Sequence, residues 1–301
     1  MPETDAADLT RAPAGRPRAL GILAGGGTLP AQIAAAAQAA GRSVFIVGLE
    51  GFADPEVLAR WPHKMIRILA AGQILEALRS AGCQDLVLIG PVRRPSLLDL
   101  RPDAEGARIL GRIGRAAFAG DDGLLAAVVK VLAEEGFRVL GAQDVLREAL
   151  APVGLLSRSA PDALAMADIQ RGITVAHALG RLDIGQGCVV QQGIVLGVEA
   201  AEGTDAMLER CAALARPGRG GVLVKLVKPG QERRADLPTI GPETVRRAAR
   251  VGLRGIAFEA GGTILTDRAD AIAAADAAGL FLLGLGPEVV SQRPPPEGRG
   301  S

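Results

Sequence analysis

Short apolar runs alternate with segments of helical periodicity along the first half of the chain. Four runs have the length and the aliphatic content of buried strands: 19–24, 43–49, 85–92 and 137–146. Four helical segments lie between them: 28–41, 72–82, about 104–118 and 119–136. Asp121 or Asp122 stands where the last of these helices needs an N-cap. Such alternation is typical of a mostly parallel, doubly wound sheet.

The second half of the chain has a less regular order of apolar and polar positions. Its predicted helices are 166–183, 203–215, 242–255 and 268–279. Its predicted strands are 188–200, as a pair that turns at Gly193, 220–228, 255–267, as a hairpin-like pair, and 280–286. Thr204 or Asp205 is expected to cap the second of these helices, and Pro242 opens the third. We therefore expect a mixed α/β domain here.

These patterns divide the chain into two α/β domains joined by a linker. Residues 19–150 form the first domain, which we expect to be Rossmann-like with a mostly parallel sheet. Residues 151–160 combine the Pro, Ser and small side chains of a linker, and 161–288 form the second domain. The polar ends, 1–18 and 289–301, have the composition of disordered tails.

Composition narrows the classes of function. The chain has 301 residues and a net charge of +1, with six Phe, one Trp and no Tyr. It thus lacks both the positive field and the aromatic platforms that nucleic-acid binding uses, so no nucleic-acid partner is expected. Cys83, Cys188 and Cys211 are widely spaced and odd in number, which favours a reducing cytoplasm over a disulfide framework. No apolar run approaches the roughly 20 residues of a membrane span.

Histidine is too scarce for a zinc or dinuclear metal hydrolase. His63 and His177 are the only two, whereas a dinuclear site needs several His and Asp ligands and a zinc hydrolase usually needs two or three His. We expect His63 to be a surface or packing residue and His177 a helix residue, so neither kind of site can be assembled. There is also no Gly-x-Ser-x-Gly motif for acyl chemistry. A metal in this chain must therefore be bound by oxygen, and Mg²⁺ is the natural choice. Asp121 and Asp122 could hold such an ion, or they could cap a helix.

A glycine run follows the first predicted strand and opens a helix, as in phosphate-binding turns. Gly25-x-Gly27 matches the first half of a dinucleotide fingerprint, but Pro30 stands where the third glycine belongs. Glu50 lies where a ribose-binding acid would lie. A nucleotide or phosphate ligand and a ligand-free tight turn both fit this run, and an NAD-dependent oxidoreductase is disfavoured by Pro30.

The second half carries a loop rich in charge between a strand and a helix. Lys225 and Lys228 end the strand, and Arg233, Arg234 and Asp236 follow before the helix that opens at Pro242. Bases, a carboxylate and a helix N-terminus suit a phosphate group with a metal or water, although a solvated surface loop is the alternative. Glu259 is a second carboxylate at the end of a predicted strand, as a ligand or a turn residue.

Six segments in order resemble one family over about residues 19–286. They are "LGILAGGGTLP", "GDDGLL", "GRLDIGQG", "VEAAEGTDAML", "KPGQERRADLPTIG" and "GIAFEAG". The chain is similar to the UDP-2,3-diacylglucosamine pyrophosphatases of the LpxI type, enzymes of lipid A synthesis. The resemblance implies Mg²⁺-dependent hydrolysis of UDP-2,3-diacylglucosamine to UMP and 2,3-diacylglucosamine 1-phosphate (lipid X). It further implies attack of water on the β-phosphorus, and a lipid product held between two α/β domains.

The resemblance also implies roles for residues. Asp236 falls on the aspartate of the family's Asp-Leu-Pro-Thr motif, on which catalysis is thought to depend. From its place at a strand end, Glu259 is expected to share the metal with Asp236. The expected substrate-binding residues are Gly26, Gly27, Thr28, Gly72, Asp122, Gln186, Thr204, Asp205, Lys225, Lys228, Gln231 and Thr239. The chain departs from the family pattern at Gln73, Pro91 and Arg93, in the first domain.

The expected partner is the lipid-linked UDP-sugar, reached by a cytoplasmic protein through peripheral contact with the inner membrane. A homodimer is a further expectation. The alternative to an enzyme is a non-catalytic nucleotide-sugar or lipid-binding regulatory protein, which would need the glycine run but not Asp236.

Overall fold

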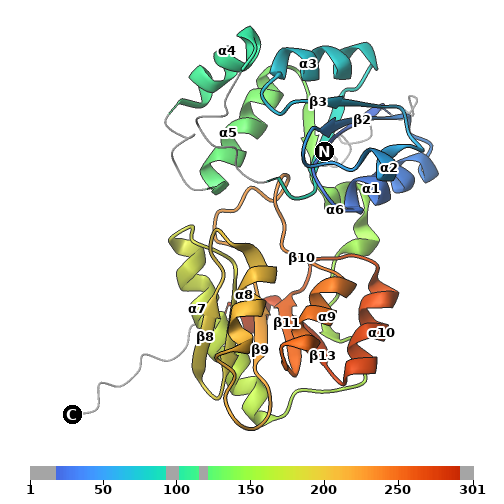
Figure 1. Ribbon diagram of the computed structural model, residues 1–301. Coiled ribbons are helices and arrows are strands. Elements are labelled where there is room, and N and C mark those ends of the chain that lie inside the picture. The colour runs from blue at the N-terminus through green and yellow to red at the C-terminus, as the bar shows by residue number, and fades with distance from the viewer. Residues whose placement is uncertain (1–17, 93–101, 115–120, 292–301) are drawn as a thin grey trace, which may run out of the picture.

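The computed structural model describes residues 18–92, 102–114 and 121–291 (Figure 1). Two α/β domains lie one above the other, and the chain passes from the upper to the lower one near residue 150. Each domain has its own sheet with helices on both faces, so the predicted fold class is confirmed.

The first domain is built on five parallel strands in the order β3-β2-β1-β4-β5. Its strands are β1 (Leu20–Ala24), β2 (Val44–Leu49), β3 (His63–Ile66), β4 (Asp85–Ile89) and β5 (Arg138–Leu140). Its helices are α1 (Leu29–Ala39), α2 (Pro55–Leu58), α3 (Ala71–Ser80), α4 (Ala104–Ile113), α5 (Asp121–Glu134), α6 (Ala142–Val145) and a 3₁₀ turn (Arg147–Ala149). This is the order of the first five strands in the dinucleotide-binding sheet, and it reverses between β1 and β4.

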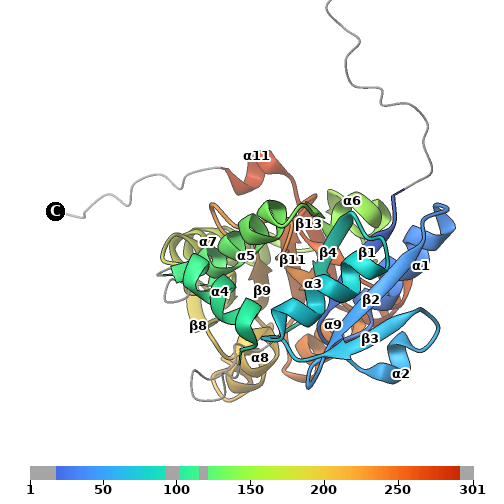
Figure 2. The same ribbon diagram turned by 90° about the horizontal axis from the view of Figure 1, so that it is seen from above.

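Two apolar clusters fill the two faces of this sheet. One contains side chains of α1 and α6, and the other those of α3 and α5, which lie on the opposite side of the strands (Figure 2). The edge strand β3 was not among the predicted strands, because only Ile66 of its four side chains is buried and the apolar signal is short. Helix α5 includes Asp121 and Asp122, so both lie in its first turn rather than before it.

The second domain has a mixed sheet of six strands in the order β6-β13-β11-β9-β7-β8. Its strands are β6 (Gly154–Leu155), β7 (Gly187–Gln191), β8 (Ile194–Val198), β9 (Val222–Lys225), β11 (Gly255–Glu259) and β13 (Phe281–Leu285). A separate parallel pair joins β10 (Thr239–Ile240) to β12 (Ile264–Leu265). The helices are α7 (Ala163–Arg181), α8 (Gly203–Ala212), α9 (Pro242–Arg250), α10 (Arg268–Ala278) and α11 (Pro287–Val290).

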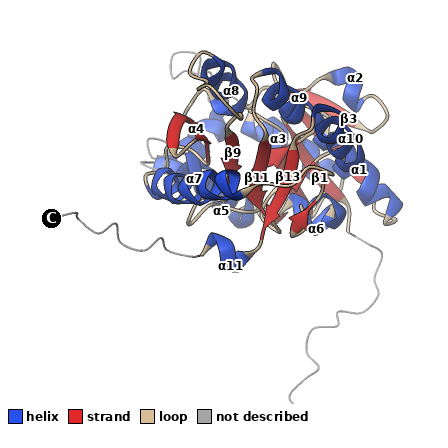
Figure 3. Ribbon diagram, turned by 90° about the horizontal axis from the view of Figure 1, so that it is seen from below, coloured by secondary structure: helices blue, strands red, loops and turns tan. Residues whose placement is uncertain are grey.

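Alternate residues of the central strands face opposite layers of helices. Leu223 of β9 packs with α8, α9 and α10, whereas Val222 and Val224 pack with α7. Figure 3 shows α7 on one side of β9, β11 and β13, with α8, α9 and α10 on the other. Because both faces are covered, the strands are apolar throughout, and a polar side chain on them stands out at the strand ends.

Three local expectations for this domain have clear outcomes. The pair that turns at Gly193 is confirmed as β7 and β8. The hairpin expected over 255–267 is wrong, because β11 pairs in parallel with β9 and β13, while β12 leaves that sheet and pairs with β10. The expected cap of α8 is also wrong: Glu202 is its N-cap residue, and Thr204 turns its hydroxyl to Glu199 instead of to the helix. Residues 154–155, inside the expected linker, form the edge strand β6.

The loop between β9 and β10 crosses from the second domain to the first. Ala235 packs against the first-domain cluster of α3 and α5, and Leu237 against that of α1 and α6. Ile264 of β12 is buried in the same α1 cluster, and Gln32 of α1 donates a hydrogen bond to Asp267 at 3.0 Å. The loop is visible in Figure 1 as the segment that rises from β10 toward α6. The two domains are thus joined through residues that flank Asp236.

Candidate active site

Charged and amide side chains gather at one edge of the second sheet, the edge that faces the first domain. Lys225 ends β9, and Glu259 ends the neighbouring strand β11. On the other side of β9, Gly187 begins β7 opposite Lys225, so Gln186 lies just beyond this edge. Glu199 follows β8 and donates its backbone N–H to the carbonyl of Gly187 at 2.8 Å. The crossing loop starts from this same edge.

Asp236 is half-buried in the crossing loop and is held by the loop itself. Its N–H donates to the carbonyl of Glu232 at 3.0 Å, in the turn that lifts the loop toward the first domain. Its Oδ2 accepts a 2.5 Å hydrogen bond from Nε2 of Gln231, which is only 7% exposed. Its Oδ1 accepts no hydrogen bond from the residues that the structure describes. One carboxylate oxygen is therefore fixed, and the other remains available to a ligand.

Both lysines of the loop face carboxylates that the sequence patterns did not single out. Lys228 Nζ lies 2.6 Å from Asp183, which follows α7 and has a left-handed backbone with φ of 51°. Lys225 Nζ donates to the Thr204 hydroxyl at 2.7 Å and lies 3.8 Å from Glu199. Both lysines are less than 10% exposed, and a buried ammonium needs such partners. Only the fold could reveal them, because each pair spans more than twenty residues of chain.

Glu199 is a buried carboxylate with an incomplete set of partners. It is 7% exposed, and its Oε1 accepts from the Thr204 hydroxyl at 2.7 Å. Its Oε2 accepts no hydrogen bond within the described residues. Gly187 makes room for it, since a Cβ at that position would lie 2.7 Å from Oε2. The charge of Lys225 is therefore balanced by Glu199 within the protein, but one oxygen of that carboxylate is left without a hydrogen bond from the described residues.

The arginines and the second carboxylate of the loop also have internal partners. Arg234 pairs with Glu232 at 2.7 Å, and its hydrogen bonds lower the pKa of the Glu232 carboxyl. Arg233 donates to the carbonyl of Gly261 at 3.3 Å. Glu259 accepts the N–H of Val227 on Oε2 at 3.0 Å, which fixes the start of the loop. The two arginines thus stabilise the loop through partners within the protein. These contacts account for their presence in the loop without a bound anion.

The remaining expected residues of the second domain lie around this edge. Gln186 uses its carbonyl to accept from Leu226 and its side-chain oxygen to accept from Gln231 at 3.2 Å. Thr239 begins β10 and donates its hydroxyl to the carbonyl of Leu237 at 3.2 Å. Asp205 lies in the first turn of α8, with Arg247 at 3.4 Å.

In the first domain, the glycine loop lies where the strand order reverses, between the ends of β1 and β4. The N–H of Gly25 donates to the carbonyl of Ile89 and that of Gly26 to Pro91, so two amides of the loop are already used. Gly27 has φ of 77°, and Thr28 precedes α1 without capping it. A Cβ on Gly25 would meet the Gly90 carbonyl oxygen. The two loops are closely packed, and any phosphate must use the amides beyond Gly26.

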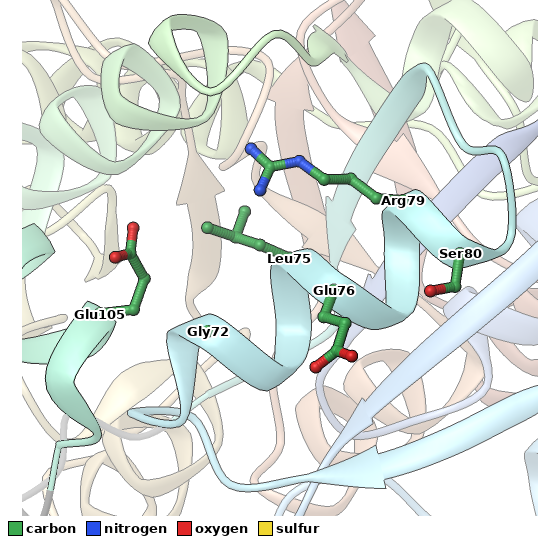
Figure 4. A pocket seen from close by; sticks show the side chains of 6 residues that line it. All are labelled: Gly72, Leu75, Glu76, Arg79, Ser80 and Glu105. Atoms are coloured by element: carbon green, nitrogen blue, oxygen red, sulfur yellow. The ribbon is translucent and has the colours of Figure 1, made fainter.

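Gly72 and Asp122 are the other residues expected to bind substrate. Gly72 lies in the first turn of α3, where its N–H donates to Asp103 at 3.0 Å. It also lines a cavity of about 420 Å³ with Leu75, Arg79 and Glu105, between α3 and the start of α4 (Figure 4). Asp122 lies in the first turn of α5. Arg93 lies outside the described residues.

The described residues hold no group of three or more His, Cys, Asp or Glu side chains placed to bind a metal. Among the helices of the same residues, none combines the length and the apolar character needed to cross a bilayer. Mg²⁺ commonly takes one or two carboxylates together with substrate phosphates and water.

Both domains match models of known protein families. The model of the LpxI N-terminal domain matches residues 19–149, and that of the LpxI C-terminal domain matches residues 152–283. A curated relative from Caulobacter vibrioides, UDP-2,3-diacylglucosamine pyrophosphatase LpxI, is 48% identical over 277 residues. The match covers 90% of this chain and 99% of that protein.

Proposed function

This chain belongs to the LpxI family, and we propose that it is a hydrolase that cleaves the pyrophosphate bond of UDP-2,3-diacylglucosamine. The products would be UMP and 2,3-diacylglucosamine 1-phosphate. The relative at 48% identity carries that substrate in its name, and the match covers 90% of this chain.

The position of Asp236 carries the mechanistic part of the proposal. This carboxylate stands on the loop that joins the domains, with one oxygen held by Gln231 and the other turned to no described donor. We propose that the unbonded oxygen orients or deprotonates the attacking water, a task that needs a positioned base within hydrogen-bond reach. Hydrolysis of a pyrophosphate depends mainly on positioning and on charge stabilisation, which suits a site without a nucleophilic side chain.

Charge on the phosphates would be met by the lysines of the same edge. An ammonium has three donors, and of those of Lys225 one is used by the Thr204 hydroxyl. We propose that Lys225 and Lys228 contact phosphate oxygens while Glu199 and Asp183 keep both ammonium groups in place. Thr28 and the amides beyond Gly26 would receive the nucleotide part from the side of the first domain.

The donor chemistry of the site fits Mg²⁺. Asp236 and Glu259 are hard oxygen ligands, and each has one oxygen that accepts no hydrogen bond within the described chain. These two residues would hold the ion, which when bound would neutralise charge on the pyrophosphate. Two protein carboxylates are few for a permanent site, so we propose that the ion arrives with the substrate.

We also propose that the protein works at the cytoplasmic face of the inner membrane, in peripheral contact with it. The proposed substrate has two acyl chains and would be drawn from the lipid layer by a protein that need not span it.

Turnover tests the proposal directly. Purified protein incubated with UDP-2,3-diacylglucosamine and Mg²⁺ is expected to release UMP, and Asp236→Ala is expected to lower kcat by at least about 100-fold, the usual contribution of a positioned base. In ¹⁸O-labelled water the label is expected in 2,3-diacylglucosamine 1-phosphate, as attack on the β-phosphorus requires. Asp270→Ala, an exposed acid on α10, is the matched control and should keep normal turnover.

Two results would contradict the proposal. Binding of the UDP-sugar without release of UMP would indicate a non-catalytic binding protein. Release of UMP at the normal rate by Asp236→Ala would leave the hydrolase intact and remove Asp236 from its centre.

A further inference from the structure

The side-chain amide of Gln231 has all of its hydrogen-bond donors in use. Nε2 donates one hydrogen bond to Asp236 Oδ2 at 2.5 Å and another to Gln186 Oε1 at 3.2 Å. An amide nitrogen has two protons, so neither remains for a phosphate or a sugar. The residue is 7% exposed, which also limits contact with a ligand. The expectation that Gln231 binds substrate therefore lacks a free hydrogen-bond donor on this side chain.

The orientation of this amide is set by the backbone. Oε1 of Gln231 accepts the N–H of Lys228 at 2.9 Å, and a backbone N–H can only donate. If the amide were turned over, its NH₂ group would face that N–H and its oxygen would face the Asp236 carboxylate. Both contacts would then be repulsive. Only one orientation satisfies all three neighbours, and it directs N–H toward Asp236.

The anchor of the amide is itself fixed. Lys228 is tied to Asp183, and Gly180 of α7 lies so close that a Cβ there would come within 2.8 Å of Pro229. Leu226 donates to the carbonyl of Gln186, and Val227 donates to Glu259. The backbone at Lys228 is thus held by its neighbours, and it fixes the Gln231 amide, which in turn holds one oxygen of Asp236.

We propose that Gln231 is a positioning residue that holds the Asp236 carboxylate in the orientation required for catalysis, and that it is not a substrate ligand. The inference rests on the proposed function, in which Asp236 acts on the attacking water. By holding Oδ2, Gln231 directs Oδ1 away from the loop and toward the reacting groups. Without that donor, the half-buried carboxylate would turn within the loop and lose this alignment.

Steady-state kinetics of Gln231→Leu and Gln231→Glu test the inference. Leucine removes the donor at similar volume, and glutamate places an acceptor against an acceptor. Both are expected to lower kcat by about 10- to 100-fold, as loss of an orienting partner does, with KM unchanged within twofold. Gln231→Glu should be the more severe. Gln143→Ala is the control, because Gln143 is half-exposed and donates to the same loop at the Arg233 carbonyl, at 3.4 Å, and not at Asp236.

A raised KM with normal kcat would show that Gln231 is a substrate ligand and would overturn the inference, as would normal kinetics in both variants. A thermal-unfolding cycle of Gln231→Leu, Asp236→Ala and the double variant gives a second answer that needs no turnover. Hydrogen-bonded partners are expected to be non-additive in such a cycle, and additive effects would contradict the contact. If wild-type protein releases no UMP, the proposed function fails, while the cycle still decides whether Gln231 holds Asp236.

Discussion

The two domains differ in how they treat a buried carboxylate. In the first domain, Asp85 at the start of β4 is 1% exposed, and Arg42 and Arg138 bond both of its oxygens. In the second domain, Glu199 is 7% exposed and has one oxygen that no described donor reaches. Asp85 lies where the strands of its sheet begin, at the end opposite to the crossing loop. Glu199 lies at the end of its sheet from which the crossing loop starts.

Under the proposed function, the difference separates a charge that supports the fold from one that helps to bind substrate. Burial alone would raise the pKa of Asp85, but hydrogen bonds from Arg138 and Arg42 outweigh it and hold that pKa below its ordinary value. A buried carboxylate whose oxygens are all hydrogen-bonded within the protein contributes to the fold and has little capacity left for a ligand. An incompletely satisfied one is costly in a folded protein and is commonly retained for function.

The largest expected effect on stability comes from Asp85→Ala. Loss of the buried carboxylate leaves Arg42 and Arg138 without their counter-charge, and the free energy of unfolding should fall by about 3 kcal/mol, the lower end for a broken buried pair because Arg138 can reach water. Urea unfolding measures it. Activity per folded molecule should be unchanged, and a lowered kcat in the remaining folded protein would break the comparison.

Glu199→Gln should have a smaller effect on stability and a clear one on turnover. The amide keeps an acceptor for Thr204, so we expect a loss of only about 1–2 kcal/mol, but Lys225 loses its counter-charge. Without that charge the ammonium moves and phosphate contacts weaken, which should lower kcat/KM about tenfold, the value of one such interaction. Parallel kinetics and urea unfolding measure both; unchanged kcat/KM would make Glu199 another structural carboxylate like Asp85.

The smallest effect is the pH dependence of the same Asp85 cluster. The folded pKa of Asp85 is lowered, so its contribution to stability is fully present above the unfolded value of about 3.9 and is lost as pH falls through the folded value. The difference in unfolding free energy between wild type and Asp85→Ala should therefore be constant from pH 7 to pH 5 and shrink below about pH 4. A difference that stays constant down to pH 2 would contradict the pairing.

The sequence patterns predicted the alternation of strands and helices well where burial is continuous. They missed β3, whose side chains are mostly outside the core, and they misread 255–267 as a hairpin. Apolar runs on both sides of a glycine turn look alike whether the second strand returns or leaves for another sheet, so pairing partners had to come from the structure.

The site was predictable in part. Asp236 could be named from the family motif, and the loop from its mix of charges. Asp183 and Glu199 could not, because their partners Lys228 and Lys225 are brought to them by the register of β7 and β9. Gln231 lies only five residues from Asp236, but its orientation depends on a backbone N–H that no sequence pattern marks.

Ala235 and Leu237 belong to the second domain by chain and to the cores of the first by packing. The residue between them is Asp236, so its position depends on the packing of both domains. A chimera of the first domain of one relative and the second of another is expected to hold this aspartate in place only where the first domain keeps the pockets for these two side chains. Exchanging the second domain would at the same time exchange the loop that carries Asp236.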